Sequence, residues 1–176
     1  ALIGTDMLAA ALPASERAAL DMDFTEALVE LFPGCTAVYF ENSGKLFTAE
    51  TIRNHTLPRE NRFIQFAVNV RFFTIQGGED MLVDTLGMSL LFLPDIQYHF
   101  RGLDPNLMVN HAYNTALYLL INDNPIETGY TIDGIPDGSA QPERWICRYE
   151  ESLIQPVREV LDIDTGMYAA GNRQYE

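Results

Sequence analysis

Every second residue in the stretch 95–101 is polar, and the four polar side chains are Asp95, Gln97, His99 and Arg101. Side chains alternate between the two faces of a β-strand, so this spacing predicts one strand with a polar and an apolar face. A polar face of an antiparallel sheet is usually solvated, and we favour that interpretation. The alternative is a small polar binding site, because such sites combine an acid, an amide, an imidazole and a guanidinium.

Asp84 is the one ionisable residue in the otherwise apolar run 81–93. A carboxyl group buried there alone would have a raised pKa, as many general acids do. The alternative is an ion pair with Arg71, because a hairpin that turns at Gly77-Gly78 places these two residues opposite each other on one face. We predict the ion pair in preference to a catalytic acid.

Two of the histidines, His99 and His111, are candidates for a metal site, with Asp95 or Asp104 as further ligands. They can meet only if the helix after residue 104 packs back over the strand before it. A closed zinc site needs four ligands and a catalytic one three, and no recognisable spacing supplies the rest. We therefore predict no metal ion and no other cofactor.

The sequence contains no motif that marks nucleophilic catalysis or phosphate binding. A Gly-x-Ser-x-Gly elbow is missing, and Gly77-Gly78 is not followed by the Lys-Ser/Thr of a P-loop. Cys35 and Cys147 match no metal or redox spacing, and they favour a reducing cytoplasm. These features favour a binding module over an enzyme.

The elements that would position these side chains are those of an α+β protein with a mainly antiparallel sheet of four to six strands. Alternating or continuous apolar patterns predict strands at residues 36–40, 65–72, 81–93, 95–101, 129–135 and 145–149. Residues 152–161 are expected to be irregular around Pro156, and Pro136 begins an exposed loop through Ser139.

Helices are predicted where apolar residues recur at helical spacing after a capping residue. Their predicted ranges, each beginning at its cap where one is named, are 6–12 (Asp6), 15–31 (Ser15), 48–54 and 104–121 (Asp104). The apolar stripe expected to face the core in the second of these is Leu20, Phe24, Ala27, Leu28 and Leu31.

Composition limits the partners. The chain of 176 residues has 25 acidic and 11 basic side chains and a formal charge of −14. This surface repels phosphate, so we expect no binding to nucleic acid or to an anionic membrane. No apolar run approaches the ~20 residues that span a bilayer. The charge is most simply explained by solubility, and a basic protein, a metal ion or a cationic ligand would also fit it. The expected partner is another protein or a second copy of this one.

Several stretches resemble a bacterial family catalogued as a domain of unknown function, number forty-two sixty-one. They are GGEDMLVDTLGM (77–88), LPDIQYHF (93–100), LDPN (103–106), Trp145, ESL (151–153) and PVREVLD (156–162). The resemblance covers residues 63–165 and, more loosely, the first sixty. It implies a bacterial, cytoplasmic α+β domain, and it supplies no reaction and no catalytic residues. Members usually begin further upstream with a β-rich segment, so residues 1–176 are expected to form a single domain that lacks it.

Three functional hypotheses follow from these observations. The leading one is a non-catalytic binding or interaction module. The second is an enzyme, such as a metal-dependent hydrolase, with its site around Asp95, His99 and Arg101. The third is one part of a larger or oligomeric assembly. The candidate binding residues are Asp84, Asp95, Gln97, His99 and Arg101.

Overall fold

A computed structural model describes residues 1–4, 11–75, 77–136 and 142–171. Their contacts form two compact units, the first made of Ala1–Asn69, Leu86–Leu93 and Leu117–Asn124, and the second of the remaining stretches. The predicted helix at 6–12 and the loop beginning at Pro136 lie mostly outside the described residues. The elements are those of an α+β protein, as the sequence predicted. The expectation of a single domain stays a prediction.

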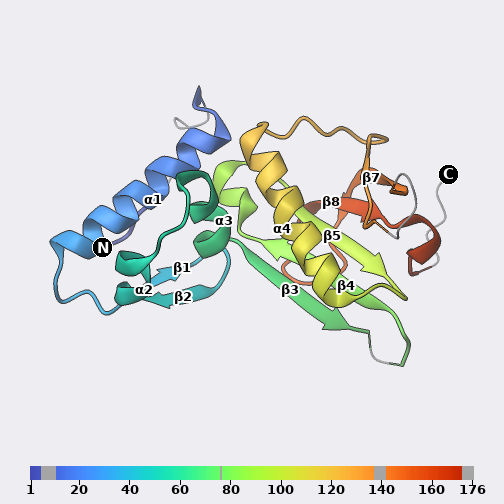
Figure 1. Ribbon diagram of the computed structural model, residues 1–176, viewed down its shortest axis with the longest axis horizontal. Helices are drawn as coiled ribbons and strands as arrows, with labels where there is room; N and C mark the ends of the chain where they lie inside the picture. Colours follow the sequence, from blue (N-terminus) through green and yellow to red (C-terminus); the bar gives the residue numbers. More distant parts are fainter. Residues whose placement is uncertain (5–10, 76, 137–141, 172–176) are drawn as a thin grey trace. The chain divides into compact units, whose positions relative to one another are not determined.

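The first unit contains a long helix and a small hairpin (Figure 1). Its elements are α1 (Ala14–Leu31), β1 (Ala37–Phe40), β2 (Lys45–Thr48), α2 (Ala49–Asn54), α3 (Arg62–Ala67) and the short 3-10 helices η2 (Arg59–Asn61) and η3 (Met88–Leu91). β1 and β2 pair antiparallel around a turn in which Gly44 has a positive φ of 71°. Thr48 caps α2, because its hydroxyl accepts the Thr51 N–H at 3.1 Å.

Helix α1 forms where it was predicted, but its predicted buried face is wrong. Leu20, Phe24 and Leu31 are exposed, whereas smaller residues such as Ala18 and Thr25 are buried. The predicted cap is also wrong. Pro13 occupies the N-cap position, and the N–H of Ala14 donates instead to Asp123 Oδ1 at 3.0 Å.

The predicted strand at 65–72 is correct only in its second half. Residues up to Ala67 form α3, and the strand β3 (Asn69–Thr74) starts two residues later. Arg62 at the start of α3 is held by Asp23 and Glu26 of α1, with N–O distances of 2.6 and 2.7 Å. These tertiary contacts override the β-propensity of the apolar residues that follow.

The second unit is organised around a six-stranded sheet. The order is β3, β4 (Met81–Leu86), β5 (Asp95–Phe100), β8 (Glu159–Asp164), β7 (Arg144–Glu151) and β6 (Thr131–Asp133). β5 and β8 are parallel, whereas β4–β5, β7–β8 and β6–β7 are antiparallel. The expectation that residues 152–161 are irregular is wrong from Glu159 onward, because β8 begins there and lies in the middle of the sheet.

The predicted strand 81–93 ends early. β4 stops at Leu86, and Gly87 then adopts a positive φ of 125° that leads into η3. A side chain at Gly87 would collide with the carbonyl oxygen of Ala67. Only glycine accommodates both the backbone conformation and this close approach.

The apolar face predicted for residues 95–101 is buried and is contacted by α4 (Pro105–Ile121). Tyr98 is fully buried, and its hydroxyl bonds His111 Nδ1 at 2.9 Å and Thr115 Oγ1 at 3.1 Å on this helix. The predicted start of the helix is confirmed, because Asp104 Oδ1 accepts the Asn106 N–H at 2.8 Å. No helix in the described part of the chain is long and apolar enough to cross a membrane.

Candidate functional site

A row of polar residues crosses five strands of the sheet on the face opposite α4. Asp84 lies opposite Gln97, Gln97 opposite Asp162, and Asp162 opposite Arg148. Arg71 on β3 extends the row by its ion pair with Asp84. Directly paired residues share a face, so the row places the amide of Gln97 between the carboxylates of Asp84 and Asp162, with an arginine at each end.

Asp84 is completely buried, and two arginines bind it. Arg71 donates from Nε to Oδ1 at 2.9 Å and from Nη2 to Oδ2 at 2.5 Å, which confirms the predicted pair. Arg158 also donates to Oδ2, at 2.7 Å. Its Nε reaches Asp95 at 3.0 Å and its Nη2 reaches the carbonyl of Thr85 at 2.7 Å. Asp84 is thus a charge paired on both sides and not a lone acid.

The interpretation of a solvated polar face is wrong for Asp95 and Gln97, because both are buried. The connection between β7 and β8 lies over them. In it, the N–H of Leu153 donates to Gln97 Oε1 at 2.8 Å, and the carbonyl of Gln155 accepts from Arg71 at 3.1 Å. Residues 152–158 therefore cover the polar face and complete its hydrogen bonds.

His99 and Arg101 lie at the other end of β5 and form a separate group. His99 Nε2 lies 3.5 Å from Asp80 Oδ2, and Arg101 Nη2 lies 3.1 Å from Asp80 Oδ1. The structure thus brings Asp84, Asp95 and Gln97 together, and it leaves the other two candidate residues with Asp80.

The two candidate metal ligands are also separated. His111 bonds Tyr98, whose side chain points to the opposite face of β5 from His99. Burial lowers the pKa of His111, which favours its neutral form. Among the described residues, no group of three or more His, Cys, Asp or Glu side chains could hold a metal ion.

The buried ion cluster, named for its two buried carboxylates, is defined as Arg71, Asp84, Asp95 and Arg158 and is suited to holding strands together. Its arginines are partly exposed. Its carboxylates and guanidinium groups bind one another and nearby backbone carbonyls. An acid or base in catalysis must reach a substrate, and these groups are engaged inside the fold. From this geometry we predict a structural role for the cluster.

Sequence reasoning missed an open groove in the first unit. It has a volume of about 960 Å³ and runs between α1 and β1. The residues of α1 and its C-cap that line it are Asp21, Thr25, Leu28, Val29 and Phe32, which recur at helical spacing on one face. All four residues of β1 line it as well.

The groove is apolar, with acidic groups at two points. Phe32 and Tyr39 are 55% and 61% exposed, one on each wall. Asp21 is only 5% exposed, and burial raises the pKa of its carboxyl group. Glu41 is the other charged side chain among the lining residues. The sequence contained a signal for this face, because Asp21, Thr25, Leu28 and Phe32 recur every three or four positions.

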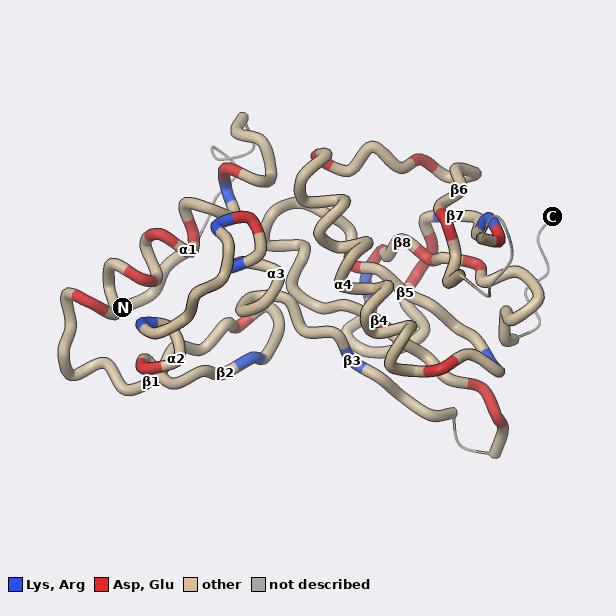
Figure 2. The backbone as a smooth tube through the Cα atoms, in the orientation of Figure 1, with Lys and Arg blue, Asp and Glu red and all other residues tan. Residues whose placement is uncertain are grey.

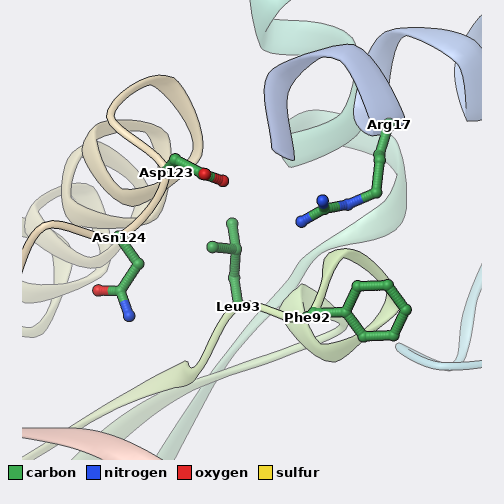
Figure 3. A pocket seen from close by; sticks show the side chains of 5 residues that line it. All are labelled: Arg17, Phe92, Leu93, Asp123 and Asn124. Carbon is green, nitrogen blue, oxygen red and sulfur yellow. The ribbon is translucent and has the colours of Figure 1, made fainter. Parts of the chain in front are cut away.

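A smaller hollow of about 280 Å³ lies elsewhere in the first unit (Figure 3). Arg17 and Asp123 point into it from two sides, with Leu93 between them. The guanidinium of Arg17 donates to the carbonyls of Leu12 and Leu91, and Asp123 accepts from the first N–H of α1. Asp123 thus caps α1 and Arg17 bonds two backbone carbonyls, so we assign no ligand to this hollow.

The fold and these two features define an α+β protein with an ion cluster on its sheet and an open apolar groove. Residues 84–164 match the model of a family described as "Domain of unknown function (DUF4261)". The predicted resemblance is confirmed over this segment, and the match brings no reaction or ligand with it. Comparison with curated proteins and with solved structures found no match. The matched segment includes Asp84, Asp95 and Arg158 and excludes α1 and β1.

Proposed function

We propose that the chain is a non-catalytic binding module that takes up a segment of another polypeptide in the groove between α1 and β1. The observation that carries this proposal is the groove itself, whose walls expose the aromatic side chains of Phe32 and Tyr39. Large aromatic side chains beside a concave apolar surface are the usual anchors of protein interfaces.

The geometry gives less support to the enzyme hypothesis. Asp95 is bound by Arg158, and His99 and Arg101 are paired with Asp80 at the other end of the strand. These residues are not gathered around a common point at which a substrate could react. The composition, the free cysteines Cys35 and Cys147 and the resemblance to a bacterial family support a module that works in the bacterial cytoplasm.

The experiment is a selection of random twelve-residue peptides displayed on phage against the immobilised chain. The affinities of enriched peptides are then measured in solution by fluorescence polarisation. We expect enriched peptides to bind the Phe32→Ser and Tyr39→Ser variants at least tenfold more weakly, because each variant removes an exposed aromatic wall of the groove.

Phe24→Ser is the matched control. Phe24 is 59% exposed on the same helix and does not line the groove, so its loss should leave the affinity unchanged. Circular dichroism establishes that each variant is folded. The proposal is wrong if no peptide is enriched, or if Phe24→Ser weakens binding as much as Phe32→Ser.

A further inference from the structure

The outer edge of β1 presents backbone groups that the β1–β2 ladder does not use. The N–H of Ala49 donates to the carbonyl of Thr36 at 2.9 Å, so residues 36 and 49 form a hydrogen-bonded pair in line with the β1–β2 register. Such pairs alternate along antiparallel strands. The backbone groups of Val38 and Phe40 therefore face β2, and those of Ala37 and Tyr39 point away from it.

This outward direction agrees with the contacts of Ala37. Its carbonyl lies 3.5 Å from the thiol of Cys35, which lines the groove and is not part of the hairpin ladder. Among the described residues, no backbone hydrogen bond outside the β1–β2 ladder involves Tyr39, and the register turns its N–H and C=O away from β2. Consecutive residues of a strand point to opposite faces, yet all of β1 lines the groove, so the groove follows the edge of the strand and not one face.

The opposite wall carries one buried carboxylate. Asp21 is 95% removed from solvent, and its side chain has no hydrogen bond or ion pair with any described residue. The nearby Thr25 hydroxyl donates to the backbone carbonyl of Asp21, at 2.8 Å, and so does not serve the carboxylate. No Lys or Arg side chain lines the groove, and its charged lining side chains are Asp21 and Glu41. The other acidic positions along α1 (Figure 2) do not line it, and Asp23 and Glu26 pair with Arg62. The charge of the groove is therefore complementary to a cation.

We propose that the occupant of the groove is an extended peptide that adds to the free edge of β1 as a third strand and places a Lys or Arg side chain against Asp21. This inference rests on the proposed function and names its partner class. Main-chain hydrogen bonds to Tyr39 would supply affinity, and the charge pair with Asp21 would supply specificity, as in other cases of strand addition.

The chain's own residues 1–4 also line the groove, but they leave the strand edge available. Leu2 is 90% exposed, and no backbone hydrogen bond joins residues 1–4 to β1. A peptide that pairs with Tyr39 therefore has no hydrogen-bonded competitor among the described residues.

The test uses the peptides enriched by the selection described above. We expect them to share a Lys or Arg at one position among alternating apolar residues. Asp21→Asn should weaken their binding at least tenfold, because it removes the charge and keeps the shape of the side chain. Glu30→Gln is the matched control, since it removes an exposed charge from the same helix outside the groove and should have no effect.

A scan of single N-methylated amides along one peptide tests strand addition directly. In an added strand every second amide donates to β1, so N-methylation should weaken binding at alternate positions. If Phe32→Ser weakens binding but the scan shows no period of two, strand addition is overturned, and if Asp21→Asn has no effect, the charge pair is overturned. Either result overturns the inference while the proposed function stands. If Phe32→Ser has no effect, the proposed function itself fails. Sedimentation that shows a dimer of the chain dissociated by Asp21→Asn would identify a second copy as the occupant and would also overturn the inference.

Discussion

The Arg71–Asp84 pair allows a quantitative test of the buried ion cluster. The perturbations are Arg71→Ala, Asp84→Ala and the double variant. Asp84→Ala leaves the guanidinium groups of Arg71 and Arg158 close together without the carboxylate that both bind. Removing one partner from a buried pair costs about 3–5 kcal/mol, and we expect Asp84→Ala to fall in that range.

Arg71→Ala should cost less, about 2 kcal/mol, because Asp84 keeps its bond to Arg158 at 2.7 Å. The coupling between the two residues is then expected to be about 2 kcal/mol, within the range found for residues in direct contact. The coupling energy should be smaller than the full cost of Asp84→Ala, because part of that cost comes from losing the bond between Asp84 and Arg158.

The assay is urea unfolding followed by tryptophan fluorescence. Trp145 is the single tryptophan of the chain, is buried, and lies on β7 in the same unit as the cluster. Its emission therefore reports unfolding of that unit, whether or not the first unit unfolds at the same urea concentration. Each midpoint and slope gives a free energy of unfolding, and the four values give the coupling.

The exposed pair Arg144–Asp133 on β7 and β6 is the matched control. Both side chains are more than half exposed, so their coupling should be about 0.5 kcal/mol or less. A coupling between Arg71 and Asp84 no larger than that of the control would show that burial adds nothing to the pair. The structural role assigned to the cluster would then be wrong.

Three further predictions concern single positions. Asp104→Ala should lower the free energy of unfolding by about 1 kcal/mol, measured by Trp145 fluorescence, because it removes the cap of α4. Gly87→Ala should lower it by about 2 kcal/mol or more, measured by circular dichroism, because of the strained φ and the collision with Ala67. Asp21→Asn should raise the melting temperature at pH 7. Burial raises the pKa of Asp21 in the folded state. The protein is therefore more stable when Asp21 is protonated, and this contribution to the free energy of unfolding is lost as pH rises through the raised pKa. The advantage of the variant should therefore shrink in acid, and equal gains at pH 7 and pH 3 would contradict this reasoning.

Local patterns were enough where local interactions decide the structure. The alternation at 95–101 predicted β5 and the buried side chain of Tyr98, and Asp104-Pro105 predicted the start of α4. The Arg71–Asp84 pair followed from hairpin geometry alone. In each case the partners are close in sequence or are fixed by one turn.

The wrong predictions share one cause. Each concerns a feature that is decided by contacts between residues distant in sequence. β8 carries Asp162 on a buried face, which no strand pattern anticipates, and Gln97 binds that carboxylate at 2.9 Å. The polar face of β5 is buried only because the connection before β8 covers it. In α1, the exposure of Phe24 and the burial of Arg17 depend on what packs against each face.

The position of β8 has a consequence for biosynthesis. It is the last strand of the sheet to be made, yet it lies between β5 and β7. Until residue 159 and those after it have been synthesised, β5 and β7 each have an open edge that can pair with another nascent chain. Arg158 arrives together with β8, so the guanidinium that neutralises Asp84 and Asp95 is also late. The sheet therefore becomes continuous, and Asp95 gains its partner Arg158, only after residues 158–164 have been made.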